Sequence, residues 1–142
     1  MELKIVRDLE DLIKVFIVRG IVFIEEQEVP YNIERDEYDL NSIHILGEED
    51  CEPIAAGRVH FLDGYAKLER IAVRKKSRGK GYGHRIVDFL VSIANEHGFY
   101  KYKMHAQAYL KEYYEKHGFV VKGDSFLEAN IEHYLMVKED VA

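Results

Sequence analysis

The sequence has one cysteine and two prolines in 142 residues, and it has no long apolar run. The single cysteine, Cys51, excludes a disulfide within the chain and argues against a zinc site built from thiolates. The apolar stretches fall far short of the roughly 20 residues that a membrane-spanning helix needs. Residues Met1 to Ile5 lack the organisation of a signal peptide. We therefore expect a cytoplasmic protein that does not associate with membranes.

Composition favours one folded domain over residues 1–142. Apolar residues make up 47% of the chain and aromatic residues 12%, which is typical of a globular protein. The formal net charge of −6 argues against a protein that binds nucleic acid through phosphate contacts. Basic residues nevertheless cluster between Arg74 and Arg85, where a small polyanion could bind.

The spacing of apolar residues predicts an α/β fold in which a mixed sheet carries helices on its faces. Asp63-Gly64 predicts a hairpin turn between two of the strands. The expected strands cover residues 3–6, 42–47, 53–62, 65–73, 101–106, 119–121 and 131–137. The expected helices run from residue 9 into the low twenties, from the glycine-rich stretch to Gly98, and over residues 109–117.

The most informative motif is Arg78-Gly79-Lys80-Gly81-Tyr82-Gly83, between the strand expected at 65–73 and the next helix. A strand, a tight glycine turn and a helix N-terminus bring backbone N–H groups and the positive end of a helix dipole to one place. Glycines let the backbone approach an anion closely and adopt positive φ. Arg78 adds a cation. The motif predicts a pyrophosphate site, although an ordinary strand–turn–helix would look similar.

A second motif, Tyr114-Glu115-Lys116-His117-Gly118-Phe119, follows the strand expected at 101–106. The two motifs together resemble the GNAT acetyltransferase superfamily, the first its acetyl-CoA-binding loop and the second its Tyr-Glu-Lys-x-Gly-Phe motif. Other segments resemble the ElaA-like branch of that superfamily: Arg19, Val22-Phe23, Glu26-Gln27, Val29-Pro30, Ala56-Gly57-Arg58, Leu68 to Val73, Ala106-Gln107, and Phe126-x-Glu128 with His133 and Met136. The resemblance spans nearly the whole chain and implies a GNAT-like single domain with a mostly antiparallel central sheet.

The resemblance also implies that acetyl-CoA is the cosubstrate and that no metal takes part. In GNAT enzymes the pantetheine arm pairs with the strand before the glycine loop, and backbone N–H groups of the loop hold the pyrophosphate. Side chains such as Lys80 and Tyr82 then need not touch the ligand. The residues expected at the cofactor are Ile71, Ala72, Val73, Arg78, Gly79, Lys80, Gly81, Tyr82, Gly83, His84, Gln107 and Tyr114.

Tyr114 is the expected general acid, because a phenol hydroxyl near the departing sulfur can protonate it or stabilise its charge. The family motif places the tyrosine directly before Glu-Lys, which selects Tyr114 over Tyr113; helical spacing alone cannot make that choice. Packing in the core is the alternative for Tyr114 and the expected role of Tyr113. Gln107 stands where many relatives carry an asparagine that contacts the cofactor.

Glu69 is a candidate general base, because the attacking amine must lose a proton. Strand alternation puts Glu69 on the same face as Ile71 and Val73 unless a bulge intervenes. A structural ion pair is the equal alternative for Glu69. Glu26 and Gln27, at the end of the first helix, are candidates for the acceptor pocket.

The remaining polar residues carry weaker hypotheses. His44, His60, His105 and His133 can titrate near neutral pH, but they are not at metal-ligand spacing, so packed or solvated roles are expected. Cys51 adjoins an acidic turn that disfavours its thiolate, which argues against an acyl-cysteine route. The acidic run from Glu25 to Asp39 either steers a cationic acceptor or, as we expect, forms a solvated loop.

The sequence thus predicts an acetyl-CoA-dependent N-acetyltransferase that moves an acetyl group to a small-molecule or peptide amine by direct attack in a ternary complex. A CoA-binding regulatory module without turnover is one alternative. An interaction domain that uses the basic loop is another, which the acidic charge elsewhere disfavours. An exposed sheet edge would also allow a homodimer.

Overall fold

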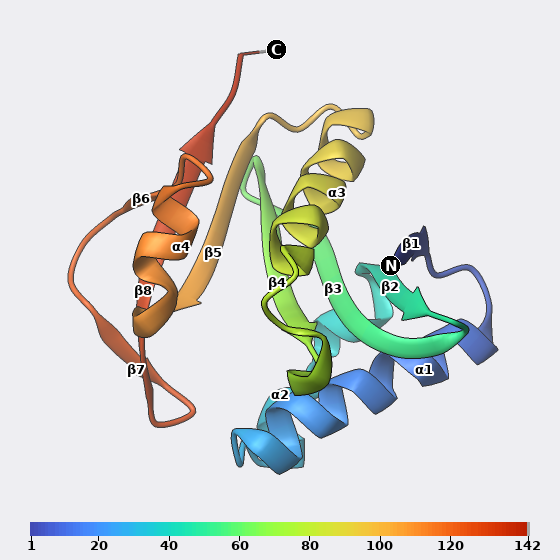
Figure 1. Ribbon diagram of the computed structural model, residues 1–142. Helices are drawn as coiled ribbons and strands as arrows, with labels where there is room; N and C mark the ends of the chain where they lie inside the picture. The colour runs from blue at the N-terminus through green and yellow to red at the C-terminus, as the bar shows by residue number, and fades with distance from the viewer. Residues whose placement is uncertain (142) are drawn as a thin grey trace.

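The computed structural model describes residues 1–141 and is built around one mixed β-sheet with helices on both faces (Figure 1). The strands are β1 (Glu2–Ile5), β2 (Ile43–Glu49), β3 (Glu52–Leu62), β4 (Tyr65–Val73), β5 (Lys101–Gln107), β6 (Val120–Val121), β7 (Phe126–Glu128) and β8 (Ile131–Glu139). The α-helices are α1 (Leu9–Arg19), α2 (Tyr31–Glu34), α3 (Tyr82–Glu96) and α4 (Lys111–Glu115). A π-helical segment, η1 (Gly20–Glu26), continues α1, and short 3₁₀ turns form η2 (Glu37–Leu40), η3 (Lys75–Ser77) and η4 (Ala108–Leu110).

The sheet confirms the predicted mixed, mostly antiparallel architecture. Its order is β1-β2-β3-β4-β5-β8-β6, with β7 paired to β8, and β4–β5 is its parallel pair. The register joins β4 to β5 only at Ala66 with Tyr102 and at Lys67 with Lys103. Beyond these two pairs the strands diverge toward their carboxyl ends (Figure 1).

The two faces of the sheet carry separate apolar clusters. Residues of α3 and α4, including Leu90 and Tyr114, pack with Leu68 of β4 on one face. Val15 and Val18 of α1 pack with Ala72 on the other face.

The expected strand over 65–73 is found with the same bounds, and the predicted Asp63-Gly64 hairpin joins β3 to β4.

A β-bulge interrupts β4 beside the cavity. Ala72 pairs with Ala56 and Glu69 pairs with Arg58, so Arg70 and Ile71 together lie opposite Gly57. Arg70 adopts φ of 55°, in the left-handed region that few non-glycine residues occupy. The extra residue turns Ile71 toward the α3 face while Glu69 shares the face of Arg58. The expectation that Glu69 and Ile71 share a face is therefore wrong, because β4 contains a bulge, the exception that the sequence analysis named.

The prediction of a solvated acidic loop holds for Glu25, Glu28 and Glu37, which are exposed, but is wrong for the carboxylates of Glu34, Asp36 and Asp39. Within the run from Glu25 to Asp39, Glu34 is only 4% exposed and accepts a hydrogen bond from Nε of Arg19, itself 1% exposed. The Asp39 carboxylate accepts a second bond from Arg19, at 2.6 Å. The segment folds into α2 and η2 because its carboxylates meet buried guanidinium groups.

Arg58 of β3 is the second guanidinium in this network. It is fully buried and donates to Asp36 at 2.7 Å, to Asp39 at 2.6 Å and to Glu69 at 2.9 Å. Burial alone would raise the pKa of Asp39, but hydrogen bonds and charge from Arg19, with further bonds from Arg58, lower it to about 2. One side chain thus connects the acidic segment to β4.

Replacing Arg58 with methionine should destabilise the protein by about 3–5 kcal/mol, because three carboxylates lose a buried partner. Urea unfolding at neutral pH measures this. Lys14→Met removes an ion pair at the surface, between Lys14 and Glu48, and should change the free energy of unfolding far less. Equal effects of the two substitutions would contradict a central role for Arg58.

Candidate active site

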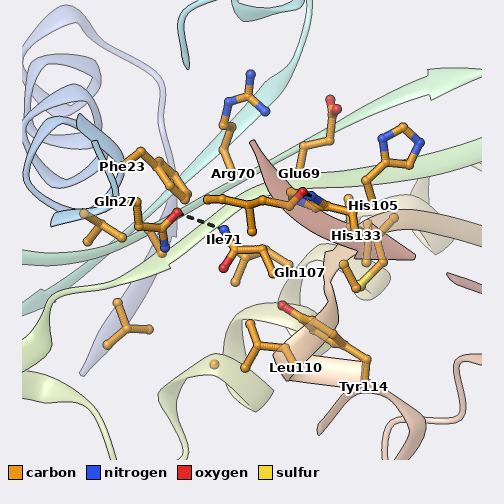
Figure 2. A pocket seen from close by; sticks show the side chains of 18 of the residues that line it. Phe23, Gln27, Glu69, Arg70, Ile71, His105, Gln107, Leu110, Tyr114 and His133 are labelled. Atoms are coloured by element: carbon orange, nitrogen blue, oxygen red, sulfur yellow. Dashed lines mark hydrogen bonds between the residues drawn. The ribbon is translucent and has the colours of Figure 1, made fainter. Parts of the chain in front are cut away.

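The divergence of β4 and β5 opens a cavity of about 860 Å³ through the sheet (Figure 2). Its walls come from both diverging strands, the glycine loop, the end of η1, α4 and the β7–β8 hairpin. Of the residues expected at the cofactor, all except Lys80 line it. The structure therefore brings the two sequence motifs to one place.

The glycine loop presents a helix N-terminus without a side-chain cap to this cavity. Gly79 and Gly81 have φ of 83° and 77°, a conformation that side chains with a Cβ rarely adopt. Gly81 is the N-cap of α3, and no side chain caps the helix there. The first N–H groups of α3 are thus available to an anion. A Cβ at Gly83 would collide with the Tyr113 hydroxyl, so glycine also lets α4 approach α3.

Side chains of the loop point to other protein groups rather than toward its centre. Arg78 holds the Glu26 carboxylate with two hydrogen bonds, at 2.7 and 2.8 Å, and donates to the carbonyl of Val73. The Tyr82 hydroxyl donates to Glu49. Lys80 extends outside the cavity, 3.8 Å from Glu49. An anion at this loop would therefore meet mainly backbone N–H groups.

Tyr114 lies under the cavity, with its hydroxyl directed toward Ile71 and Gln107 (Figure 2). The side chain is only 6% exposed. Burial raises the pKa of Tyr114, which keeps the phenol protonated. Tyr113, by contrast, stacks on His84 with ring centroids 4.1 Å apart.

Gln27 and Gln107 meet across the cavity. The Gln107 amide donates to the Gln27 side-chain oxygen at 2.8 Å, the bond drawn in Figure 2. Glu26, the other candidate for the acceptor pocket, does not line the cavity, because Arg78 holds its carboxylate. Of this pair, only Gln27 is placed to touch a ligand in the cavity.

Glu69 borders the cavity but is engaged by three cationic or imidazole groups. Its carboxylate lies 2.9 Å from Arg58, 2.7 Å from His60 and 3.3 Å from Lys67. Burial would raise the pKa of Glu69, but the charges of Arg58 and Lys67 lower it to about 2. Such a carboxylate is a weak proton acceptor, so the geometry favours the ion-pair role that the sequence left open.

Sequence reasoning gave no site role to three further residues that line the cavity: His105, Glu128 and His133. Two signals in the sequence point to them: His105 and Gln107 are two residues apart on one strand and so share a face, and Glu128 and His133 belong to one of the ElaA-like segments. Glu128 comes from β7, a strand that the sequence analysis did not predict.

Residues 22–140 match the family model described as the acetyltransferase (GNAT) domain. The chain therefore belongs to the GNAT family of acetyltransferases, as its motifs predicted. It is 39% identical to the uncharacterized N-acetyltransferase YjcF of Bacillus subtilis over 98% of this chain and 100% of that protein.

Solved structures show the same fold. Escherichia coli ElaA superposes with a TM-score of 0.87 at 25% identity, covering 97% of this chain and 99% of that one. The PaiA N-acetyltransferase of Thermoplasma acidophilum, solved in complex with coenzyme A, superposes with a TM-score of 0.74 at 16% identity, covering 99% and 100%. At this sequence identity, the similarity to PaiA shows a shared fold and nothing further.

Among residues 1–141, no three His, Cys, Asp or Glu side chains are grouped so that they could hold a metal ion. None of the helices in that range is both long and apolar enough to cross a membrane.

Glu69→Gln should lower the free energy of unfolding at pH 7 by about 1–3 kcal/mol, since Arg58 loses a buried partner. Because the pKa of Glu69 falls from 4.5 to about 2 in the folded state, this stabilisation is present above about pH 4.5 and is lost as pH falls toward 2. Urea unfolding at pH 7 and pH 3 should show the two proteins converging. Glu132→Gln, on an exposed strand position, is the control; a Glu69→Gln defect that does not shrink in acid would contradict the ion-pair role.

Proposed function

We propose that the protein is an acetyl-CoA-dependent N-acetyltransferase that acts on an amine acceptor in the cytoplasm. The observation that carries this proposal is the uncapped N-terminus of α3, which opens into the same cavity as the Tyr114 hydroxyl. A long ligand with a phosphate group at one end and a reactive group some distance away fits this arrangement. The coenzyme A complex of PaiA, which has the same fold, supports the choice of ligand.

The residues present suit this cosubstrate. Backbone N–H groups from Gly79 to His84 would hold the pyrophosphate, and the edge of β4 from Ile71 to Val73 would pair with the pantetheine amides, because β5 has diverged from it there. Bound acetyl-CoA supplies the thioester that carries the acetyl group. Gln107 would offer a side-chain amide beside it.

Tyr114 would act as the proton donor to the departing sulfur. Its raised pKa keeps the proton on the phenol until a thiolate develops nearby. Cys51 is exposed and lies outside the cavity, so direct attack by the amine is the route that the geometry supports. The acceptor would enter from the α1 and α2 face, past Phe23 and Gln27.

Acetyl-CoA and CoA should each raise the thermal stability of the purified protein, with ADP weaker. At about a hundred times its dissociation constant a ligand adds about 2.7 kcal/mol. Gly81→Glu should abolish the stabilisation, since a carboxylate would project at the helix N-terminus. Gly64→Glu is the matched control, because Gly64 has a similar φ of 82° and open space but does not line the cavity. Equal acetyl-CoA affinity in both variants, measured by calorimetry, would reject the loop as the cofactor site.

Tyr114→Phe should lower kcat by about 100-fold, because the proton donor is lost, while the dissociation constant of acetyl-CoA changes little. Steady-state kinetics with any acceptor found in an amine screen, together with calorimetry, measures both. Tyr134→Phe removes a phenol hydroxyl outside the cavity and should keep the wild-type rate. An unchanged kcat in Tyr114→Phe would exclude this residue as the acid.

A further inference from the structure

Glu128, His105 and His133 form a compact cluster that borders the cavity on the face of the sheet from which the acceptor would enter, and Figure 2 shows the two histidines of this cluster. Glu128 is the last residue of β7, and a tight turn through Ala129 and Asn130, both with positive φ, joins it to β8. The Phe126 ring packs edge-on against His105 and stacks on His133. The hairpin therefore places one carboxylate against two imidazole rings that come from neighbouring strands.

The contact between Glu128 and His105 sets the tautomer of the imidazole. Nδ1 of His105 lies 3.0 Å from Oε1 of Glu128. The hydrogen bond to His105, opposed by burial, lowers the pKa of Glu128, so the carboxylate is ionised and can only accept. Nδ1 of His105 must therefore carry the proton. Nε2 of the neutral ring keeps its lone pair, which is the arrangement that makes an imidazole a general base.

We propose that His105, positioned by Glu128, is the group that takes the proton from the acceptor ammonium; this inference rests on the proposed function. The ammonium gives one N–H proton to Nε2 of His105, which leaves a neutral amine with a lone pair and an imidazolium whose charge Glu128 balances. The imidazolium later returns that proton to solvent. The second proton lost by the nitrogen neutralises the departing sulfur, with Tyr114 as the relay.

Other basic groups near the cavity are less suited to this role. Glu69 is tied to Arg58 and Lys67, and His60 does not line the cavity. His133 donates Nδ1–H to the carbonyl of Ile131, is only 6% exposed, and has its Nε2 3.7 Å from Glu128.

The charged and titratable groups around His105 come from several strands. They are Glu128 on β7, His133 on β8, Lys103 on β5, and Lys67 and Glu69 on β4. Lys67 and Glu69 pair with each other. Glu128 is the carboxylate in contact with the His105 ring.

The tautomer can be tested without acetyl-CoA. Long-range ¹H–¹⁵N NMR of the purified protein at pH 8 should show His105 with Nδ1 protonated and Nε2 unprotonated. In Glu128→Gln the side-chain amide can donate to Nδ1, so the population should shift toward the Nε2–H form. Glu132→Gln, one strand away and outside the cavity, should leave the His105 signals unchanged. An Nε2–H tautomer in the wild type, or no response to Glu128→Gln, would overturn the proposal.

The catalytic part is tested by the pH dependence of kcat/KM with spermidine, free lysine and an unblocked hexapeptide as acceptor probes. His105→Gln should be about 100-fold slower near pH 8. The wild-type advantage should shrink toward pH 5, where an imidazole is protonated, and toward pH 10, where solvent already deprotonates the amine. A purely structural role would give a ratio that does not change with pH. Such a ratio, or the same pattern in His133→Gln or Glu69→Gln instead, would overturn the assignment to His105.

The outcomes separate this inference from the proposed function. A wild-type protein that neither binds acetyl-CoA nor acetylates any probe fails the proposed function. A wild-type protein that acetylates a probe, with His105→Gln equally active and equally folded by thermal melting, fails only the inference. If acetyl-CoA binds and no probe is acetylated, the NMR tautomer and its response to Glu128→Gln decide.

Discussion

The site depends on how briefly β4 and β5 remain paired. Two residue pairs hold the strands together, and past them each strand has an edge with free backbone groups inside the sheet. An interior edge of this kind is rare because unpaired N–H and C=O groups are costly unless a ligand or water satisfies them. Here the edge faces a cavity that reaches both sides of the sheet, so groups on opposite faces can act on one ligand.

The two faces contribute different chemistry to that cavity. The α3 and α4 face supplies backbone N–H groups and a buried phenol, which suit an extended anionic ligand that carries the leaving group. The α1 and α2 face supplies carboxylates and imidazoles, which suit a cationic amine. The bulge at Arg70 contributes to this division, because it places Glu69 and Ile71, which are two residues apart on β4, on opposite faces of the sheet.

The sequence predicted those parts of the structure that local patterns determine. The strand at 65–73, its hairpin and the glycine loop follow from alternation, a turn dipeptide and glycine spacing. β7 escaped prediction because it is three residues long and its turn is Ala129-Asn130 rather than an Asn-Gly type. Asp39 and Glu69 form their hydrogen bonds with arginines that are distant in the sequence, Arg19 and Arg58. The pairing of His105 with Glu128 likewise joins residues 23 positions apart. Charge patterns alone do not reveal such partners.

The hydrogen bonds made by Glu26 and Gln27, at the end of η1, affect what a measured ligand affinity means. Glu26 occupies the guanidinium of Arg78, and Gln27 occupies the amide of Gln107, so neither group is idle before a ligand arrives. Any ligand that uses these groups takes part in an exchange, in which one set of hydrogen bonds replaces another. Its measured binding free energy is then the difference between the hydrogen bonds that the ligand makes and those that it replaces. Because Glu26 of η1 bonds to Arg78 of the glycine loop, the same exchange couples the loop energetically to η1 on the opposite wall.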